Sequence, residues 1–324
     1  AQGLDGKKAD ELFELILHFA SYGFNKSHAA AYTYVTFQTA YMKTYYPAEF
    51  MAALITSEET NADKISRYID ECKRLDIAIL PPSVNKSAKE FSVVSEGGKD
   101  AIIYGLGAIK GVGGAAIENI LEEQAKGEFK DIDDFVSRVD NFKVNKKVFE
   151  SLIKSGSFDS FGLTRKMMLN NLDNIVEACK NAATIKKNAA ESLFGDDESM
   201  ATVKTSLVRD DSELELKTKL KFELESVGIY LSGHPLDEYR EQISKIKYTL
   251  SDKFDELPEN GEMLLVGKIE DLTTRISKKN GKKMGTIEML DLYGTVEIAV
   301  FDRQLGAVES MSPDERDLPH VFKV

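Results

Sequence analysis

The stretch that decides how this chain folds and what it binds lies between residues 106 and 123. It reads Leu106-Gly107-Ala108-Ile109-Lys110-Gly111-Val112-Gly113-Gly114-Ala115-Ala116-Ile117-Glu118-Asn119-Ile120-Leu121-Glu122-Glu123. Apolar residues at helical spacing predict a helix from about residue 116, and the glycines before it predict a tight turn. The first amides of such a helix have no partner inside it and carry partial positive charge. The stretch therefore predicts a backbone site for phosphate.

The segments around this turn suggest a repeated unit. Residues 91–94 and 101–104 alternate around Gly97-Gly98 and predict a β-hairpin before the turn. Short helices are predicted from residue 132 and over 148–153. A second glycine turn, residues 156–162, leads into a helix over 165–172 and roughly repeats the first unit. The pattern resembles the helix-hairpin-helix motif, which grips a nucleic-acid backbone without reading bases. The alternative is a glycine cap followed by an ordinary amphipathic helix.

The residues before this unit read as helices. An apolar face runs over 12–20, and Ser27 is expected to cap a long helix from His28 to about residue 45. Pro47 can start another helix, and a further one is predicted over 65–75. The apolar run 77–80 is stopped by Pro81-Pro82, which we interpret as a boundary.

The residues after it change character twice. Residues 181–212 are polar and acidic, which predicts a largely mobile linker. Helix returns over 213–245, broken by Gly233-His234-Pro235. Strands are then predicted over 263–269, 286–290, 296–301 and 320–324, with a short helix over 304–309. Three strands, a helix and a fourth strand suggest an OB-fold that lacks its last strand.

Composition limits the class of protein. The chain has 324 residues, enough for two or three domains, and two cysteines without a CxxC pair, which fits a reducing cytoplasm and not a zinc site. No apolar run is long enough to span a membrane. The net charge of −12 argues against nucleic acid, but residues 190–215 hold eight acids and two bases. Local charge is therefore the better guide.

Several longer motifs resemble one family. They are Phe24-Asn25-Lys26-Ser27-His28-Ala29-Ala30-Ala31-Tyr32, Tyr45-Tyr46-Pro47-Ala48-Glu49-Phe50-Met51-Ala52-Ala53, Ile79-Leu80-Pro81-Pro82, the run from Tyr104 to Gly113, the run from Leu152 to Asp159 and Gly228-Ile229-Tyr230-Leu231-Ser232-Gly233-His234-Pro235-Leu236. In this order they resemble the bacterial replicative DNA polymerase III alpha subunit, a C-family DNA polymerase. The resemblance implies a carboxy-proximal fragment of such a polymerase.

The resemblance implies a multidomain α+β fold. Its parts would be helical distal fingers over 1–82, a clamp-binding domain with tandem helix-hairpin-helix units over 83–195, an acidic linker with connecting helices over 196–245, and a partial OB-fold β-barrel over 246–324. The family's catalytic carboxylates lie in the palm, and we find no matching Asp-x-Asp here. We therefore expect no catalytic residue, metal or cofactor in this fragment, while the parent would use Mg²⁺ bound outside it.

Candidate DNA contacts fall in three places. The helix start with Asn25, Lys26 and His28 is a candidate for nucleotide or template contact, although Asn25 and Ser27 could merely cap the helix. Duplex phosphates would meet the first turn and a nearby basic run: Lys110, Gly111, Gly113, Gly114, Lys143, Lys146 and Lys147. A single strand would meet the bases around Asn280-Gly281: Arg275, Lys278, Lys279, Lys282 and Lys283. Edge-strand protection is the alternative for this last group.

Two further expectations concern apolar residues. Ala190-Glu191-Ser192-Leu193-Phe194 resembles the peptide that docks on a ring-shaped sliding clamp, with Ala190 where Gln is usual. A small amphipathic helix packed on its own domain is the alternative. Tyr293 and Phe301 are candidates for base stacking, with core packing favoured.

These predictions together indicate the partners. They are duplex and single-stranded DNA, the sliding clamp and other replicase subunits, in the cytoplasm and with no membrane contact. A stand-alone DNA-binding adaptor with hairpin and OB domains and no polymerase activity is the alternative function. A nuclease would need clustered carboxylates or histidines, and the sequence shows none.

Overall fold

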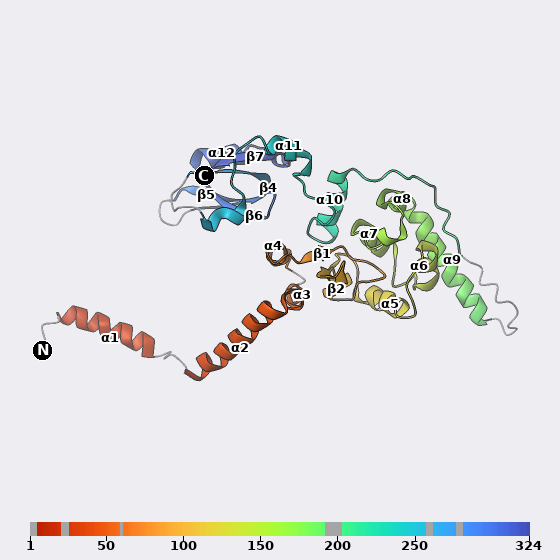
Figure 1. The fold of residues 1–324 in the computed structure, drawn as a ribbon, viewed down its shortest axis with the longest axis horizontal. Coiled ribbons are helices and arrows are strands. Elements are labelled where there is room, and N and C mark those ends of the chain that lie inside the picture. The colour runs from red at the N-terminus through yellow and green to blue at the C-terminus, as the bar shows by residue number, and fades with distance from the viewer. Residues whose placement is uncertain (1–4, 21–25, 59–60, 192–202, 257–261, 277–280) are drawn as a thin grey trace. The chain divides into compact units, whose positions relative to one another are not determined.

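The structure is a computed structural model that describes residues 5–20, 26–58, 61–191, 203–256, 262–276 and 281–324 (Figure 1). The chain divides into two compact units, Ala1–Phe50 and Met51–Val324, which are considered one at a time.

The first unit is helical, as predicted. It contains α1 (Gly6–Ala20), α2 (Lys26–Tyr45) and the start of α3 (Pro47–Ser57). Pro47 opens α3, where its missing amide hydrogen costs nothing. The cap expected at Ser27 is wrong, because α2 already begins at Lys26 and Ser27 lies in its first turn. Large apolar side chains on both helices are exposed, among them Phe13, Phe37 and Tyr41.

The second unit begins with a helix and a small sheet. They are α4 (Ala62–Arg74), β1 (Ala78–Leu80), β2 (Ser92–Glu96) and β3 (Lys99–Ile103), with the strands in the order β1-β3-β2. The predicted β2–β3 hairpin is confirmed, and Gly97 and Gly98 both have positive φ in its turn. β1 was not expected. It pairs in parallel with β3, so the sheet joins segments on both sides of Pro81-Pro82.

A group of short helices follows the sheet. They are η1 (Leu106–Ala108), α5 (Gly114–Gln124), α6 (Ile132–Arg138), α7 (Lys146–Lys154), η2 (Asp159–Phe161), α8 (Arg165–Asn170) and α9 (Leu172–Glu191). Four buried rings, Phe129, Phe135, Phe149 and Phe158, meet between them with centroids 4.8 to 6.4 Å apart. These aromatic pairs make a shared core that holds both glycine turns in place.

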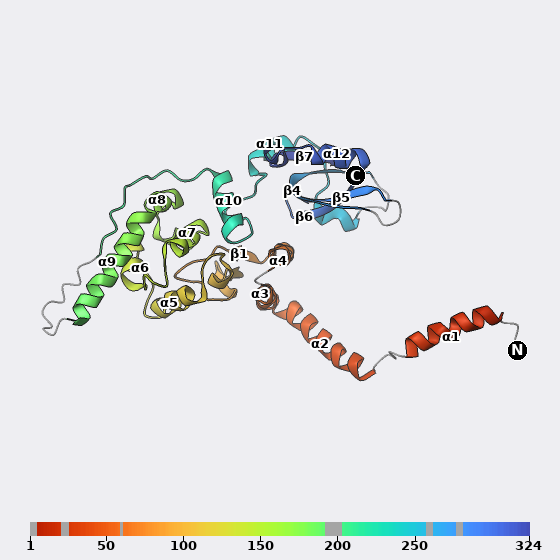
Figure 2. The ribbon, with the colours of Figure 1, turned by 180° about the vertical axis from the view of Figure 1, so that it is seen from behind.

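The mobile linker expected over 181–212 is wrong for residues 181–191 and 203–212, the part of it that the structure describes. Residues 181–191 continue α9, and residues 203–215 form an extended strap that returns past α8 to α10 (Figure 2). The strap is hydrogen-bonded to the helices. Buried Asn171 donates to the Val208 carbonyl at 2.9 Å and accepts from the Val208 amide at 2.8 Å. Acidic composition indicated solvent exposure, but it did not reveal these backbone partners.

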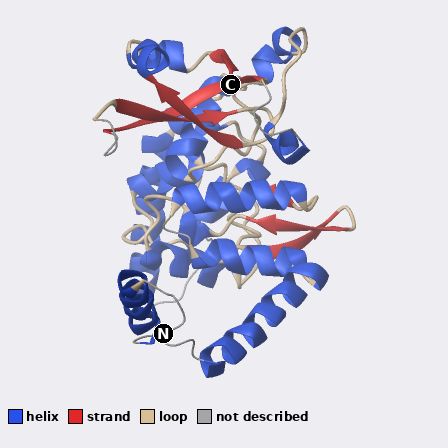
Figure 3. Cartoon of the chain, turned by 90° about the vertical axis from the view of Figure 1, so that its left-hand side faces the viewer, coloured by secondary structure: helices blue, strands red, loops and turns tan. Residues whose placement is uncertain are grey.

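The rest of the second unit contains the connecting helices and a larger sheet. These elements are α10 (Leu216–Ser226), η3 (Asp237–Tyr239), α11 (Arg240–Ile243), η4 (Ser251–Glu256), β4 (Leu264–Ile276), β5 (Lys283–Leu290), β6 (Thr295–Phe301), α12 (Asp302–Glu309), α13 (Pro313–Arg316) and β7 (Pro319–Lys323). The strands form a curled antiparallel sheet in the order β6-β5-β4-β7 (Figure 3). All four predicted strands are confirmed, and α13 is additional. Ile287, Met289, Ile298 and Leu305 lie in the core on one face of this sheet.

Candidate nucleic-acid interface

The first glycine turn has an open, anion-accepting geometry. Gly111 has φ of +91°, a region that favours glycine, and Ile109 and Val112 on either side are buried. Gly113 is the N-cap of α5 and provides no side chain to accept from the first amides of that helix. Lys110, Gly111, Gly113 and Gly114 are all exposed. The predicted turn followed by a helix is confirmed, and the residues at the start of α5 are exposed next to Lys110 in the sequence.

Helix α7 brings a second lysine to this turn. A Cβ atom placed on Gly111 would lie 2.6 Å from the Ser151 Oγ and 3.6 Å from the Lys147 Cε. The Asn145 side chain starts α7 by accepting from the amides of Lys147 and Val148. The sequence identified Lys147 as part of a basic run but did not show which residues it lies beside. In the structure it lies beside the Gly111 turn.

The carbonyl groups at the end of α10 accept hydrogen bonds from residues at and before the same turn. The Lys110 amide donates to the Ser226 carbonyl at 2.8 Å, and the Tyr104 hydroxyl donates to the Val227 carbonyl at 2.6 Å. Tyr104 is completely buried, and burial raises the pKa of its hydroxyl, so it remains a donor. These contacts join residues more than a hundred positions apart, and the sequence gives no local signal for them.

The other two lysines of the basic run differ from Lys147. Lys143 is exposed in the loop before α7, whereas Lys146 forms an ion pair with Asp173 of α9. Among the residues that the structure describes, no carboxylate pairs with Lys110, Lys143 or Lys147. Three of the four predicted lysines therefore remain available to phosphate.

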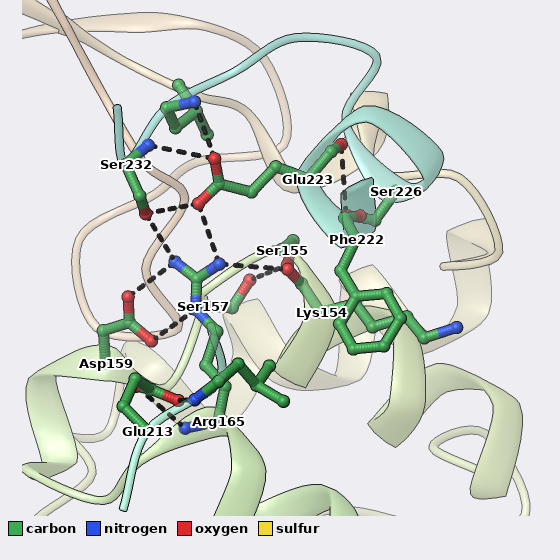
Figure 4. Close-up of polar contacts among 12 residues, drawn as sticks. Lys154, Ser155, Ser157, Asp159, Arg165, Glu213, Phe222, Glu223, Ser226 and Ser232 are labelled. Carbon is green, nitrogen blue, oxygen red and sulfur yellow. Dashed lines mark hydrogen bonds and ion pairs between the residues drawn. The ribbon is translucent and has the colours of Figure 1, made fainter. Parts of the chain in front are cut away.

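The second glycine turn is filled by an arginine. The Arg165 side chain is 1% exposed and lies against Gly156, where a Cβ atom would come within 2.2 Å of its guanidinium. Arg165 binds Asp159 through two nitrogens, at 3.0 and 2.7 Å, and Glu223 through the third, at 2.8 Å (Figure 4). The predicted second glycine turn lies between α7 and α8, and this buried ion pair closes its interior.

Glu223 of α10 is the centre of this arrangement, and sequence analysis missed it. Its carboxylate is 0% exposed and accepts from the amides of Leu231 and Ser232 at 2.8 and 2.9 Å. It also accepts from the Ser232 hydroxyl. Two amides, a hydroxyl and a guanidinium satisfy the buried charge. The only indication in the sequence of a buried role for Glu223 was its position on the same helical face as the apolar Leu220.

The amides that start α8 are also occupied. Glu213 of the strap accepts from the amides of Arg165 and Lys166 at 3.4 and 3.3 Å, and the Lys166 ammonium lies 3.5 Å from Asp210. The two hairpins are therefore unequal: the first exposes its amides, and the second binds carboxylates of its own chain.

The remaining predicted residues are only partly described. Asn25 lies outside the described residues, Lys26 begins α2, and the exposed His28 ring lies 4.4 Å from Tyr32. Ala190 and Glu191 end α9, so the proposed clamp peptide begins inside a helix, while Ser192, Leu193 and Phe194 lie outside the described residues.

The structure describes part of the basic loop and the aromatic residue Phe301. Lys278 and Lys279 lie outside the described residues. Arg275 is exposed on β4, while Lys282 and Lys283 form ion pairs with Asp302 and Glu309 of α12. The core role favoured for Phe301 is wrong, because it is 50% exposed at the end of β6.

Two properties of the described residues bear on other classes of protein. None of their helices has the length and apolar character that crossing a membrane requires. In the same part of the chain, no three His, Cys, Asp or Glu side chains are grouped as metal ligands.

Comparison with known proteins agrees with this geometry. Residues 76–168, which contain both turns, match the helix-hairpin-helix motif family. The chain thus contains a DNA-binding motif of the class that its turns define.

Relatives then identify the family. The chain is 53% identical over 97% of its length to the DNA polymerase III subunit alpha of Campylobacter jejuni, and 46% identical over 99% to that of Helicobacter pylori strain J99. It is 39% identical over 98% to that of Thermus aquaticus. The chain therefore belongs to the family of DNA polymerase III alpha subunits. It spans about a quarter of the length of these relatives.

Proposed function

We propose that this chain is the part of a replicative DNA polymerase that holds the duplex by its backbone. The observation that carries this proposal is the turn at Gly111, which follows Lys110, lies close to Lys147 and leads into the exposed, uncapped start of α5. Such a site supplies two cations and a helix N-terminus to one stretch of phosphates. Because none of these groups is arranged to read base edges, binding would be independent of sequence.

Two further contacts belong to the same proposal. The peptide Ala190-Glu191-Ser192-Leu193-Phe194 would dock on the sliding clamp, with Leu193 and Phe194 as anchors. Tethering by even a weak peptide raises the effective concentration of the protein at DNA. The loop that carries Arg275, Lys278, Lys279, Lys282 and Lys283 would follow a single strand beside an OB-fold. Asn25, Lys26 and His28 would contact nucleotide or template.

The parent protein would be a DNA-directed DNA polymerase of the cytoplasm that assembles with other replicase subunits. Its Mg²⁺ ions and their carboxylate ligands would lie outside these 324 residues. The fragment would accordingly bind DNA and clamp without extending a primer.

A salt series with duplex DNA tests the backbone contact. Lys110→Glu and Lys147→Glu should each weaken binding equally on unrelated sequences and lower the slope of log K against log salt by about one. Lys126→Glu, near the far end of α5, is the matched control, since Lys126 pairs with Glu123. Unchanged slopes for both variants would contradict the proposal.

Surface plasmon resonance with the purified cognate clamp tests the peptide separately. Leu193→Ala combined with Phe194→Ala should abolish binding to the clamp, while duplex affinity stays at the wild-type value. Wild-type clamp affinity in this double variant would reject the peptide and leave the hairpin proposal intact.

A further inference from the structure

Phe142 is the most exposed large apolar side chain in the part of the chain that the structure describes. It is 87% exposed and lies in the loop of residues 139–145 between α6 and α7 (Figure 1). The other two apolar residues of this loop, Val139 and Val144, are 3% and 1% exposed. The loop therefore buries its valines in the core and turns only the ring outward.

Hydrogen bonds around Asp140 hold this loop in one conformation. The Asp140 amide donates to the side chain of buried Asn119 on α5 at 2.7 Å, and the Asp140 carboxylate accepts from the Phe142 amide at 2.9 Å. The Asp140 carbonyl accepts from the amides of Lys143 and Val144 at 3.1 and 2.8 Å. Bringing the ring into the core would require breaking these bonds, so the ring is held in solvent.

The loop connects the two helices that form the proposed duplex site. Asn119 belongs to α5, which follows the Gly111 turn, and the loop leads directly into α7, whose Lys147 lies beside that turn. Phe142 precedes Lys147 by five residues, so their backbones are at most about 18 Å apart. Phosphates of one DNA strand follow each other at about 3.4 Å along the helix axis, so this span covers about five nucleotides. A duplex bound at the turn is within reach of the ring.

The neighbours of the ring decide what it binds, because a single exposed apolar side chain is common on protein surfaces. Lys143 and Lys147 are exposed, and neither pairs with a carboxylate among the described residues. The one acid of residues 139–147, Asp140, directs its carboxylate to a backbone amide. Free cations around an aromatic ring suit a nucleotide, whose phosphate meets the cations while its sugar offers apolar surface to the ring. They favour a polyanion over the apolar surface of another protein.

We propose that Phe142 packs against deoxyribose groups of the duplex whose phosphates bind at the Gly111 turn, and that Lys143 binds an adjacent phosphate. Sugars are the same at every position of a strand, so the contact is independent of sequence. It adds an apolar component to a site otherwise made of charged and polar groups. This role depends on the proposed duplex function and extends the site to a loop outside both glycine turns.

A salt series of duplex binding by the intact 324-residue chain separates the ring from the cations. Phe142→Ala should weaken binding about five- to tenfold at every salt concentration, because salt does not screen an apolar contact. The slope of log K against log salt should stay at the wild-type value. Phe142→Tyr should bind as tightly as wild type, since it keeps the ring. Lys143→Ala should instead lower the slope by about one.

Val321→Ala, at an apolar position 50% exposed on β7, is the matched control and should change neither affinity nor slope. Thermal unfolding of Phe142→Ala should match wild type, because the ring is not part of the core. Wild-type duplex affinity in Phe142→Ala, a loss that disappears at high salt, or a loss confined to single-stranded DNA would overturn the contact.

Lys110→Glu distinguishes this contact from the site at the turn. Weaker duplex binding in Lys110→Glu with wild-type binding in Phe142→Ala would keep the proposed function and reject the ring contact. The reverse result would reject the turn and keep the ring as the duplex contact.

Discussion

The Arg165 guanidinium and the Glu223 carboxylate are 2.8 Å apart, and their side chains are 1% and 0% exposed. This pair joins the helix after the second turn to α10, whose last residues hold the first turn through the Ser226 and Val227 carbonyls. The closed hairpin is therefore part of the structural support of the open one.

Removing one partner of this pair should destabilise the second unit strongly. Glu223→Ala leaves a buried guanidinium with one carboxylate and leaves the amides of Leu231 and Ser232 without an acceptor, so we expect a loss of about 3–5 kcal/mol in urea unfolding. Lys245→Ala, which breaks the exposed pair with Glu241, should cost at most about 0.5 kcal/mol. Equal effects of the two variants would contradict a structural role for Glu223.

Gly111 should tolerate no side chain. Gly111→Ala places a Cβ atom 2.6 Å from the Ser151 Oγ at a positive φ, so α7 or the turn must shift. We expect duplex affinity to fall at least tenfold in a titration. Gly114→Ala is the matched comparison: nothing lies within 4 Å of its Cβ position, so its thermal stability should equal that of wild type. Any loss of DNA binding in that folded variant would show how closely phosphate approaches α5.

His234 should make stability fall in mild acid. Burial lowers its pKa, and nearby Lys73 and Arg240 act in the same direction, although Asp237 opposes them. Its Nδ1 accepts from the Leu236 amide, so protonation would break that bond. Because the folded pKa lies below the unfolded value of about 6.5, the contribution is complete above that pH and is lost as pH falls through and below it. Thermal unfolding from pH 7.5 to 5 measures this loss.

His234→Asn separates this effect from general acid sensitivity. Asparagine can accept from an amide two residues ahead and does not titrate. We expect the variant to have a flatter stability profile over the same range. A profile parallel to that of wild type would assign the acid sensitivity to other groups.

The strap should detach when its anchor is removed. Asn171 is 2% exposed and makes two bonds to Val208, so Asn171→Leu should free residues 203–209 for cleavage in limited proteolysis. Asn174→Ala removes one exposed bond to the Ser206 carbonyl and should have a much smaller effect. Equal cleavage rates for the wild type and Asn171→Leu would mean that other contacts hold the strap.

Local sequence signals predicted the elements but not the distant partners. Glycines at 97, 98 and 111 require particular backbone angles, and alternating apolar residues define β5 and β6, so the turns and strands were correctly predicted. The pairing of β1 with β3, the acceptor role of Glu223 and the position of Lys147 beside Gly111 depend on chain packing. Charge counts also misled, because strap acids such as Glu213, although exposed, accept from backbone amides of the same chain.

The parallel bonds between β1 and β3 have a mechanical consequence. Strand β3 is held on one side by β1 and on the other by β2, and the chain enters the Gly111 turn only a few residues after β3 ends. Helix α4 directly precedes β1, so a displacement of α4 would be transmitted to β3 through the β1–β3 hydrogen bonds. The Gly111 turn would then move together with α4, and the position of the phosphate site would depend on residues that precede the turn in the sequence.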